Sequence, residues 1–86
     1  MDTAFLRSFK GGHLDKEITA SSYSRETLML FTGAIDGTVC HWNVENSKLE
    51  FTFKEEATKV NAISLIFPYQ LLLSAHFSGN ILGWKT

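Results

Sequence analysis

The sequence predicts an all-β protein made of two consecutive, related β-sheet units. The first observation behind this prediction is an internal repeat with a spacing of 42 positions. The repeat relates residues of the same kind: Thr32 and Ser74, Gly37 and Gly79, Val39 and Ile81, Trp42 and Trp84. In addition, turn residues separate short apolar or alternating runs every eight to twelve positions, as in all-β proteins. The runs 28–31 and 71–73 are apolar on both faces, which requires a sheet covered on both sides.

The first repeat, about 12–53, contains four expected strands. They lie on the runs 17–23, 28–33, 38–44 and 48–53. Asp36-Gly37 stands between the second and third runs, where a tight hairpin needs residues that tolerate positive φ. The last run alternates, as expected of a half-exposed outer strand. Its apolar face would hold Leu49, Phe51 and Phe53.

The second repeat, about 54–86, follows the same pattern but ends before a fourth strand. Its expected strands are 60–65, 71–75 and 81–85. A run at 4–10 resembles the outer strand of a preceding unit. Residues 1–86 are therefore interpreted as one small domain. Such a chain buries only about 60–65% of the surface that its unfolded form exposes, so we expect marginal stability.

Composition and charge exclude several classes of partner and location. The net charge is -1, with no block of like charge, so nothing favours nucleic acid or an anionic membrane surface. The most apolar stretch, 62–77, is interrupted by polar residues and is too short to span a bilayer. The N-terminus lacks the apolar core of a signal peptide. Cys40 is the single cysteine and cannot form an internal disulfide, so a cytoplasmic location is expected.

The motifs of the first repeat resemble those of the WD40 repeat family. They are Gly12-His13, Ile18, Tyr23-Ser24, the run 28–34, Asp36-Gly37-Thr38-Val39 and Trp42-Asn43. Both repeats lack the aspartate that often follows the tryptophan, having Asn43 and Lys85 instead. The resemblance covers nearly the whole chain. It implies two four-stranded antiparallel blades of a WD40-type propeller, in an incomplete, open ring.

The resemblance also implies a buried structural tetrad in the first blade. The matching positions are His13, Thr32, Asp36 and Trp42. The chemistry is consistent, because an indole only donates, a hydroxyl donates and accepts, a neutral imidazole does one at each nitrogen, and a carboxylate only accepts. Such a relay would tie the loop that carries His13 to the hairpin at Asp36.

The second blade departs from this tetrad. Ser74 and Trp84 are retained as a partial tetrad, but Glu55-Glu56 stands in place of Gly-His and Ser78 in place of the turn aspartate. We therefore expect a broken relay that contains no imidazole, and a looser rim on this blade.

No enzymatic, metal or cofactor site is expected. Thr32 lies mid-strand with its hydroxyl committed to the tetrad, whereas a catalytic nucleophile needs an exposed position beside an oxyanion hole. The residues His13, Cys40, His41 and His76 share no ligand spacing, so His41 and His76 are interpreted as strand histidines at a blade edge. Gly11-Gly12 lacks the helix and lysine of a phosphate-binding loop.

The resemblance places a partner site on the upper rim of the blades. The corresponding positions are Glu17, Thr19 and Ile35 in the first blade and Lys59, Asn61 and Phe77 in the second. An apolar residue at a hairpin tip is suited to anchor a peptide or protein. The alternative, that Ile35 and Phe77 merely pack on adjacent loops, stays open at this point.

The sequence favours a non-catalytic protein–protein interaction module of the scaffold type. The main alternative is a truncated or short-form product of a longer WD40 repeat protein, with no activity of its own. Closed propellers have four to eight blades, so two blades leave apolar flanks uncovered. Self-assembly, or docking onto other propeller blades, would cover them.

Overall fold

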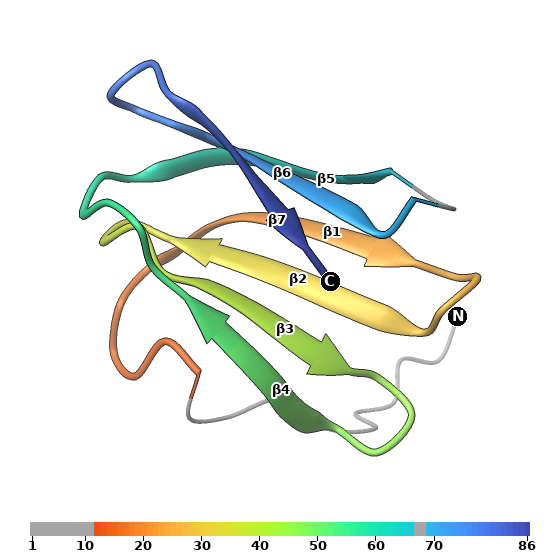
Figure 1. Cartoon of the computed structure of the whole chain (residues 1–86). Helices are drawn as coiled ribbons and strands as arrows, with labels where there is room; N and C mark the ends of the chain where they lie inside the picture. Colours follow the sequence, from red (N-terminus) through yellow and green to blue (C-terminus); the bar gives the residue numbers. More distant parts are fainter. Residues whose placement is uncertain (1–11, 67–68) are drawn as a thin grey trace, which may run out of the picture.

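The computed structural model describes residues 12–66 and 69–86, which form two antiparallel β-sheets (Figure 1). The first sheet consists, in order, of β1 (Ile18–Ser24), β2 (Met29–Ala34), β3 (Val39–Asn43) and β4 (Lys48–Phe53). The second consists of β5 (Val60–Ile66), β6 (Leu71–His76) and β7 (Ile81–Lys85). Each strand pairs with the next one along the chain, so both sheets are simple meanders.

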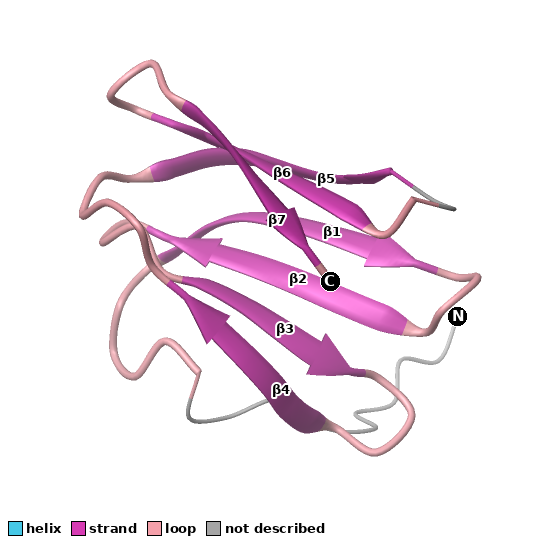
Figure 2. Ribbon diagram, viewed as in Figure 1, coloured by secondary structure: helices cyan, strands magenta, loops and turns pink. Residues whose placement is uncertain are grey.

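The predicted all-β fold is confirmed, and each predicted strand in the described residues begins and ends within one residue of the observed one. Only loops and turns connect the strands in the described ranges (Figure 2). The second sheet has three strands there, in agreement with a second repeat that ends before its fourth strand. The strand expected at 4–10 lies outside the described residues. The described residues contain no helix that could span a membrane.

The two equivalent hairpins use the same turn chemistry. Gly37 has φ 90° and Gly79 has φ 95°, values that an L side chain adopts only with strain. In each turn the glycine N–H donates to the carbonyl of the last residue of the preceding strand, Ala34 O at 3.1 Å and His76 O at 2.9 Å. A polar side chain before each glycine accepts from the backbone after it, as Asp36 Oδ1 does from Thr38 N at 3.1 Å.

The outer strand β4 does not alternate as predicted. A register shift places Leu49 opposite Trp42 and Phe51 opposite His41. Because neighbouring residues of β3 point to opposite faces, Leu49 and Phe51 are also on opposite faces, and the expected single apolar face is wrong. The expected exposure of this strand is observed, since all its side chains except Phe53 are exposed.

The two sheets pack face to face, and β5 lies on β1 and β2 (Figure 1). The core between them consists of the fully buried side chains Phe31, Val39, Val60 and Leu72. Gly33 allows the closest approach, because a Cβ at this position would lie 2.5 Å from Val60 Cγ1. The Thr19 hydroxyl also joins the sheets by donating to Val60 O at 2.6 Å. This packing accounts for the apolar residues on the inner face of each sheet.

Candidate functional site: two polar relays and the hairpin rim

The first relay links three of the four predicted tetrad residues. Trp42 Nε1 donates to Thr32 Oγ1 at 2.8 Å, and His13 Nε2 lies 2.7 Å from the same hydroxyl. His13 Nε2 is also 3.1 Å from Thr32 O, which can only accept, so the proton is assigned to Nε2. The His13 side chain is buried, and this burial lowers its pKa, although the Thr32 carbonyl and the charge of Asp36 oppose the shift. A neutral imidazole therefore ties the loop before β1 to the centre of β2.

Asp36 stands apart from these three residues. Among the described residues, no hydrogen bond joins it to His13; its Oδ1 accepts from Thr38 N and its Oδ2 lies 3.9 Å from Lys54 Nζ. Partial burial pushes the pKa of Asp36 upward, but the Thr38 hydrogen bonds and the Lys54 charge outweigh it, so the pKa is lowered. The carboxylate therefore shapes the hairpin turn and acts on His13 through its charge.

The second blade contains a complete hydrogen-bonded relay, so the expectation that it lacks an imidazole is wrong. Trp84 Nε1 donates to Ser74 Oγ at 2.9 Å, and Ser74 Oγ lies 3.0 Å from His76 Nε2. His76 Nδ1 lies 3.1 Å from Thr58 O, so Nδ1 carries the proton and Nε2 accepts from Ser74. His76 is buried at the end of β6 and is not an edge histidine.

The strand pleat explains how His76 reaches this position. Residues two apart on a strand share a face, so His76 reaches the Ser74 hydroxyl within β6 without help from a loop. The internal repeat does not predict this role of His76, because the histidine of the first blade comes from the loop before the sheet. The signal that could have found it is the spacing Ser-x-His at the end of an inner strand.

Glu56 takes the place of the missing turn carboxylate. It accepts from Ser78 Oγ and Thr58 Oγ1, and its other oxygen accepts from Asn80 Nδ2 at 2.9 Å. Hydrogen bonds from Ser78, then Thr58 and Asn80, lower the pKa of Glu56 to about 2. His76 Nδ1 is 3.8 Å away. In the first blade the imidazole comes from the loop before the sheet and the carboxylate from the hairpin turn. In the second blade the imidazole comes from strand β6 and the carboxylate from the β4–β5 loop.

The geometry of the relays fits a structural role and not a catalytic one. Ser74, His76 and Glu56 supply a hydroxyl, an imidazole and a carboxylate, but Ser74 is fully buried and its hydroxyl already accepts from Trp84. A substrate therefore has no access to the oxygen. Within the described ranges, no group of three or more His, Cys, Asp or Glu side chains could hold a metal ion.

His41 occupies a different environment from the relay histidines. Its ring is buried in β3, stacked on Phe31 at 4.7 Å between centroids and facing Phe51 at 6.0 Å. Its Nε2 lies 3.0 Å from Met29 Sδ. Burial lowers its pKa, with the charge of Glu50 opposing. The neutral ring packs as part of an aromatic row with Phe31 and Phe51.

The predicted rim residues gather at one end of the sheets. The β2–β3 hairpin, the β6–β7 hairpin and the β4–β5 loop all lie at the left-hand end of Figure 1. Ile35 N donates to Glu17 O at 2.9 Å, and Phe77 N donates to Lys59 O at 2.8 Å. Each apolar tip is therefore held beside a charged residue of the neighbouring strand end.

Exposure distinguishes one rim residue from the others. The side chains of Glu17, Ile35, Lys59, Asn61 and Phe77 are exposed. Phe77 is 75% exposed and Ile35 46%, so among the described residues neither tip is buried on a neighbouring loop. Thr19 is half-buried, and its hydroxyl is used between the sheets. Leu14, 87% exposed in the loop before β1, was not predicted as a rim residue.

Comparisons with known proteins agree with this geometry. No protein-family model matches the chain. Periodic tryptophan protein 2 of Arabidopsis thaliana is 32% identical over 68 residues, which is 79% of this chain but 8% of that protein. The β-propeller domain of Cps50 (Swd1) from Myceliophteria thermophila has a TM-score of 0.79 and 23% identity over 92% of the chain. The RRP9 WD40 repeats also have a TM-score of 0.79, with 20% identity over 92% of the chain.

The chain has the fold of WD40-type propeller blades. It spans only 23% and 25% of the two solved propeller chains, as well as 8% of the sequence relative. In these terms each sheet is one WD40 blade, complete in the first repeat and three-stranded in the second as far as the structure describes it. The two relays are the polar centres of those blades.

Proposed function

We propose that the chain acts as a non-catalytic protein-interaction module whose hairpin rim binds a protein or peptide. WD40 relatives support a scaffold or interaction role in general. The observation that carries the specific site is the exposure of Phe77 and Ile35 at equivalent hairpin tips on the same end of the molecule. A large apolar side chain exposed on a rigid turn is costly in water and gains from burial against a partner.

The surroundings of the two tips suggest the chemistry of that partner. Glu17 lies beside Ile35 and Lys59 beside Phe77, so opposite charges flank the two anchors. Such a rim suits an apolar segment with a basic residue near the first blade and an acidic one near the second. We also propose a cytoplasmic location, because Cys40 is free and buried and the chain has no other cysteine.

A second candidate is that the chain forms part of a larger propeller and has no activity alone. The chain covers only a small part of the length of its relatives, which favours this candidate. An open apolar face on the second sheet also favours it. Under it, the rim would bind a partner only when further blades are present.

The proposal is tested by selecting peptides from a displayed random library on the purified chain and measuring their affinity by fluorescence anisotropy. The double variant Ile35→Ser, Phe77→Ser should lose about tenfold or more in affinity. The matched control is Tyr69→Ser, which removes an equally exposed aromatic residue from the β5–β6 turn at the other end. Unchanged binding in the double variant would place the site elsewhere, and failure to select any peptide would favour the second candidate.

A further inference from the structure

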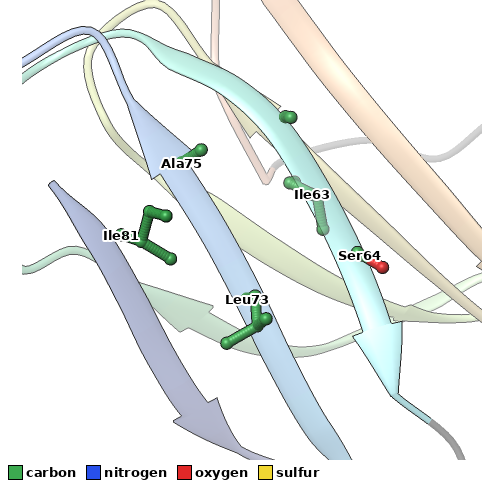
Figure 3. Close-up of a pocket in the computed structure, with 6 residues that line it drawn as sticks. Ile63, Ser64, Leu73, Ala75 and Ile81 are labelled. Carbon is green, nitrogen blue, oxygen red and sulfur yellow. The ribbon is translucent and has the colours of Figure 1, made fainter. Parts of the chain in front are cut away.

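The outer face of the second sheet carries an apolar groove of about 180 Å³, shown in Figure 3. Apart from Ile63, whose side chain packs on the first sheet, the groove lies on the opposite side of β5 and β6, because Leu73 and Ala75 alternate along β6 with the core residue Leu72. Its lining residues are Ala62, Ile63, Ser64, Leu73, Ala75 and Ile81. Ile81 is 69% exposed there, so the apolar surface is open to water within the described structure.

The internal repeat shows what kind of surface fits this face. Counted 42 positions back, Leu73, Ala75 and Ile81 correspond to Phe31, Gly33 and Val39 of the first sheet. Those three positions are covered by β5, and Val39 is fully buried where Ile81 is 69% exposed. The groove is therefore the counterpart of an interface that the molecule already forms, and β5 belongs to both.

The repeat also identifies the strand that would cover the groove. The side chains of β5 that pack on the first sheet are Val60, Ile63 and Leu65. Their counterparts in β1 are Ile18, Ser21 and Tyr23. Ile18 is 47% exposed and Tyr23 51%, although Val60 is fully buried. Paired residues share a face of the sheet, and Ser21 pairs with Thr32 and Tyr23 with Leu30. Thr32 and Leu30 alternate along β2 with Phe31, which packs on the second sheet, so this face of β1 points away from that sheet.

We propose that the groove on β5–β7 binds the outward face of β1 from a second copy of this chain, head to tail. Ile18 would take the position that Val60 takes over Gly33, and Tyr23 the position of Leu65. One polar contact has a counterpart as well: Thr19 donates to Val60 O within the chain, and exposed Asn61 stands at the repeat position of Thr19. Its amide is placed to donate to the Ile18 carbonyl of the second copy.

The fit differs from the internal interface in one respect. Gly33 leaves no room for a Cβ beneath Val60, whereas Ala75 carries one, and Ile18 is longer than Val60. The second copy must therefore lie farther from β6 than β5 lies from β2. The groove itself supplies space at Ala75, and Ser21 is smaller than Ile63, so the strand can settle without a clash. The groove and the three β1 side chains carry no charge that would oppose the contact.

A contact between two different faces is heterologous and leaves one free face at each end of an assembly. Copies therefore add to one another until a ring closes or the assembly stays open. We expect light scattering after size exclusion to give a mass above the monomer that rises with concentration. Ile81→Glu, at an exposed position, should restore the monomer, whereas Phe51→Glu on β4 should not. Circular dichroism reports whether each variant is folded.

Cysteine cross-linking tests the arrangement itself. An Ile18→Cys chain mixed with an Ala75→Cys chain should form a covalent dimer under mild oxidation, at least several-fold above the background of the unmodified chain with its buried Cys40. The control mixture is Phe51→Cys with Ala75→Cys. A monomeric unmodified chain, an oligomer without the Ile18–Ala75 cross-link, or cross-links only between two Ala75→Cys chains would each overturn the proposal. The variant Ile35→Ser, Phe77→Ser should assemble normally, which separates this contact from the rim.

Discussion

The clearest test of how the blades are held together compares alanine substitutions at the two hairpin glycines. Gly37 and Gly79 occupy the same turn position with φ of 90° and 95°, so alanine meets the same backbone strain at both. That strain costs about 1–2 kcal/mol. Their surroundings differ, because a Cβ at Gly37 would collide with the carbonyl of Glu56 and lie 2.9 Å from Thr58 O, whereas nothing lies within 4 Å of one at Gly79.

The collision at Gly37 involves backbone atoms, which cannot rotate away as a side chain can. Relief requires the 54–59 loop to move, and over-packing of this kind costs a further amount of about 1–3 kcal/mol. Gly79→Ala should therefore lower the free energy of unfolding by about 1–2 kcal/mol and Gly37→Ala by about 2–5 kcal/mol. For a domain whose total stability is about 5–15 kcal/mol, the second change removes a large part of it.

Equilibrium unfolding in urea, followed by the fluorescence of Trp42 and Trp84, measures both variants. The expected result is a lower midpoint for Gly37→Ala than for Gly79→Ala at a similar m-value. Equal losses would show that the loop does not press on the first hairpin and that the close contact between the blades at this point has no energetic role. A concentration series first identifies a protein concentration at which neither variant self-associates. The two urea midpoints are then compared at that concentration, so self-association does not contribute to their difference.

The remaining predictions concern the relays. His13→Ala and His76→Ala should each lower the free energy of unfolding by about 1–3 kcal/mol, because each removes one of the two hydrogen-bond partners of a relay hydroxyl. Urea midpoints measure the loss, and a negligible effect of His76→Ala would contradict the second relay. The pKa of Glu56 is about 2 in the fold against 4.5 for the free side chain. Its charge therefore stabilises the chain above pH 4.5, and this contribution is lost as the pH falls towards 2. Thermal unfolding across that range should be less pH-dependent in Glu56→Gln, whereas Glu55→Gln should keep the original profile.

The strands were predictable from the sequence because they depend on local patterns, and three members of the first relay were predictable from the resemblance to WD40 repeats. Alternation and turn residues predicted each strand, and the repeat predicted a serine or threonine 10 positions before each tryptophan. The second relay was missed because its members changed position together. His76 reaches the hydroxyl along its own strand and Glu56 reaches the hairpin from the loop, and neither stands where the first repeat has its counterpart.

Two further differences arise from tertiary structure. The bulge in β4 depends on pairing with β3, so alternation within 48–53 alone could not show that Leu49 and Phe51 face opposite sides. The hydroxyl of Thr19 bonds to β5, a strand about forty residues away in the sequence. Thr19 is not part of the exposed rim because the blades pack closely at Gly33. The pattern of a single strand carries no information on this contact.

Contacts with the 54–59 loop explain how the rim can present apolar residues on short hairpins. Backbone atoms of the 54–59 loop lie directly against Gly37 and hold the first hairpin in place. The second has open space around Gly79, and its side-chain links to the same loop run through Glu56, by way of Ser78 and Asn80. Glu56 also lies beside His76, which connects through Ser74 to Trp84 in the blade interior. The carboxylate thus couples the turn that carries Phe77 to the core of its blade, in a position where the first blade uses backbone contact instead.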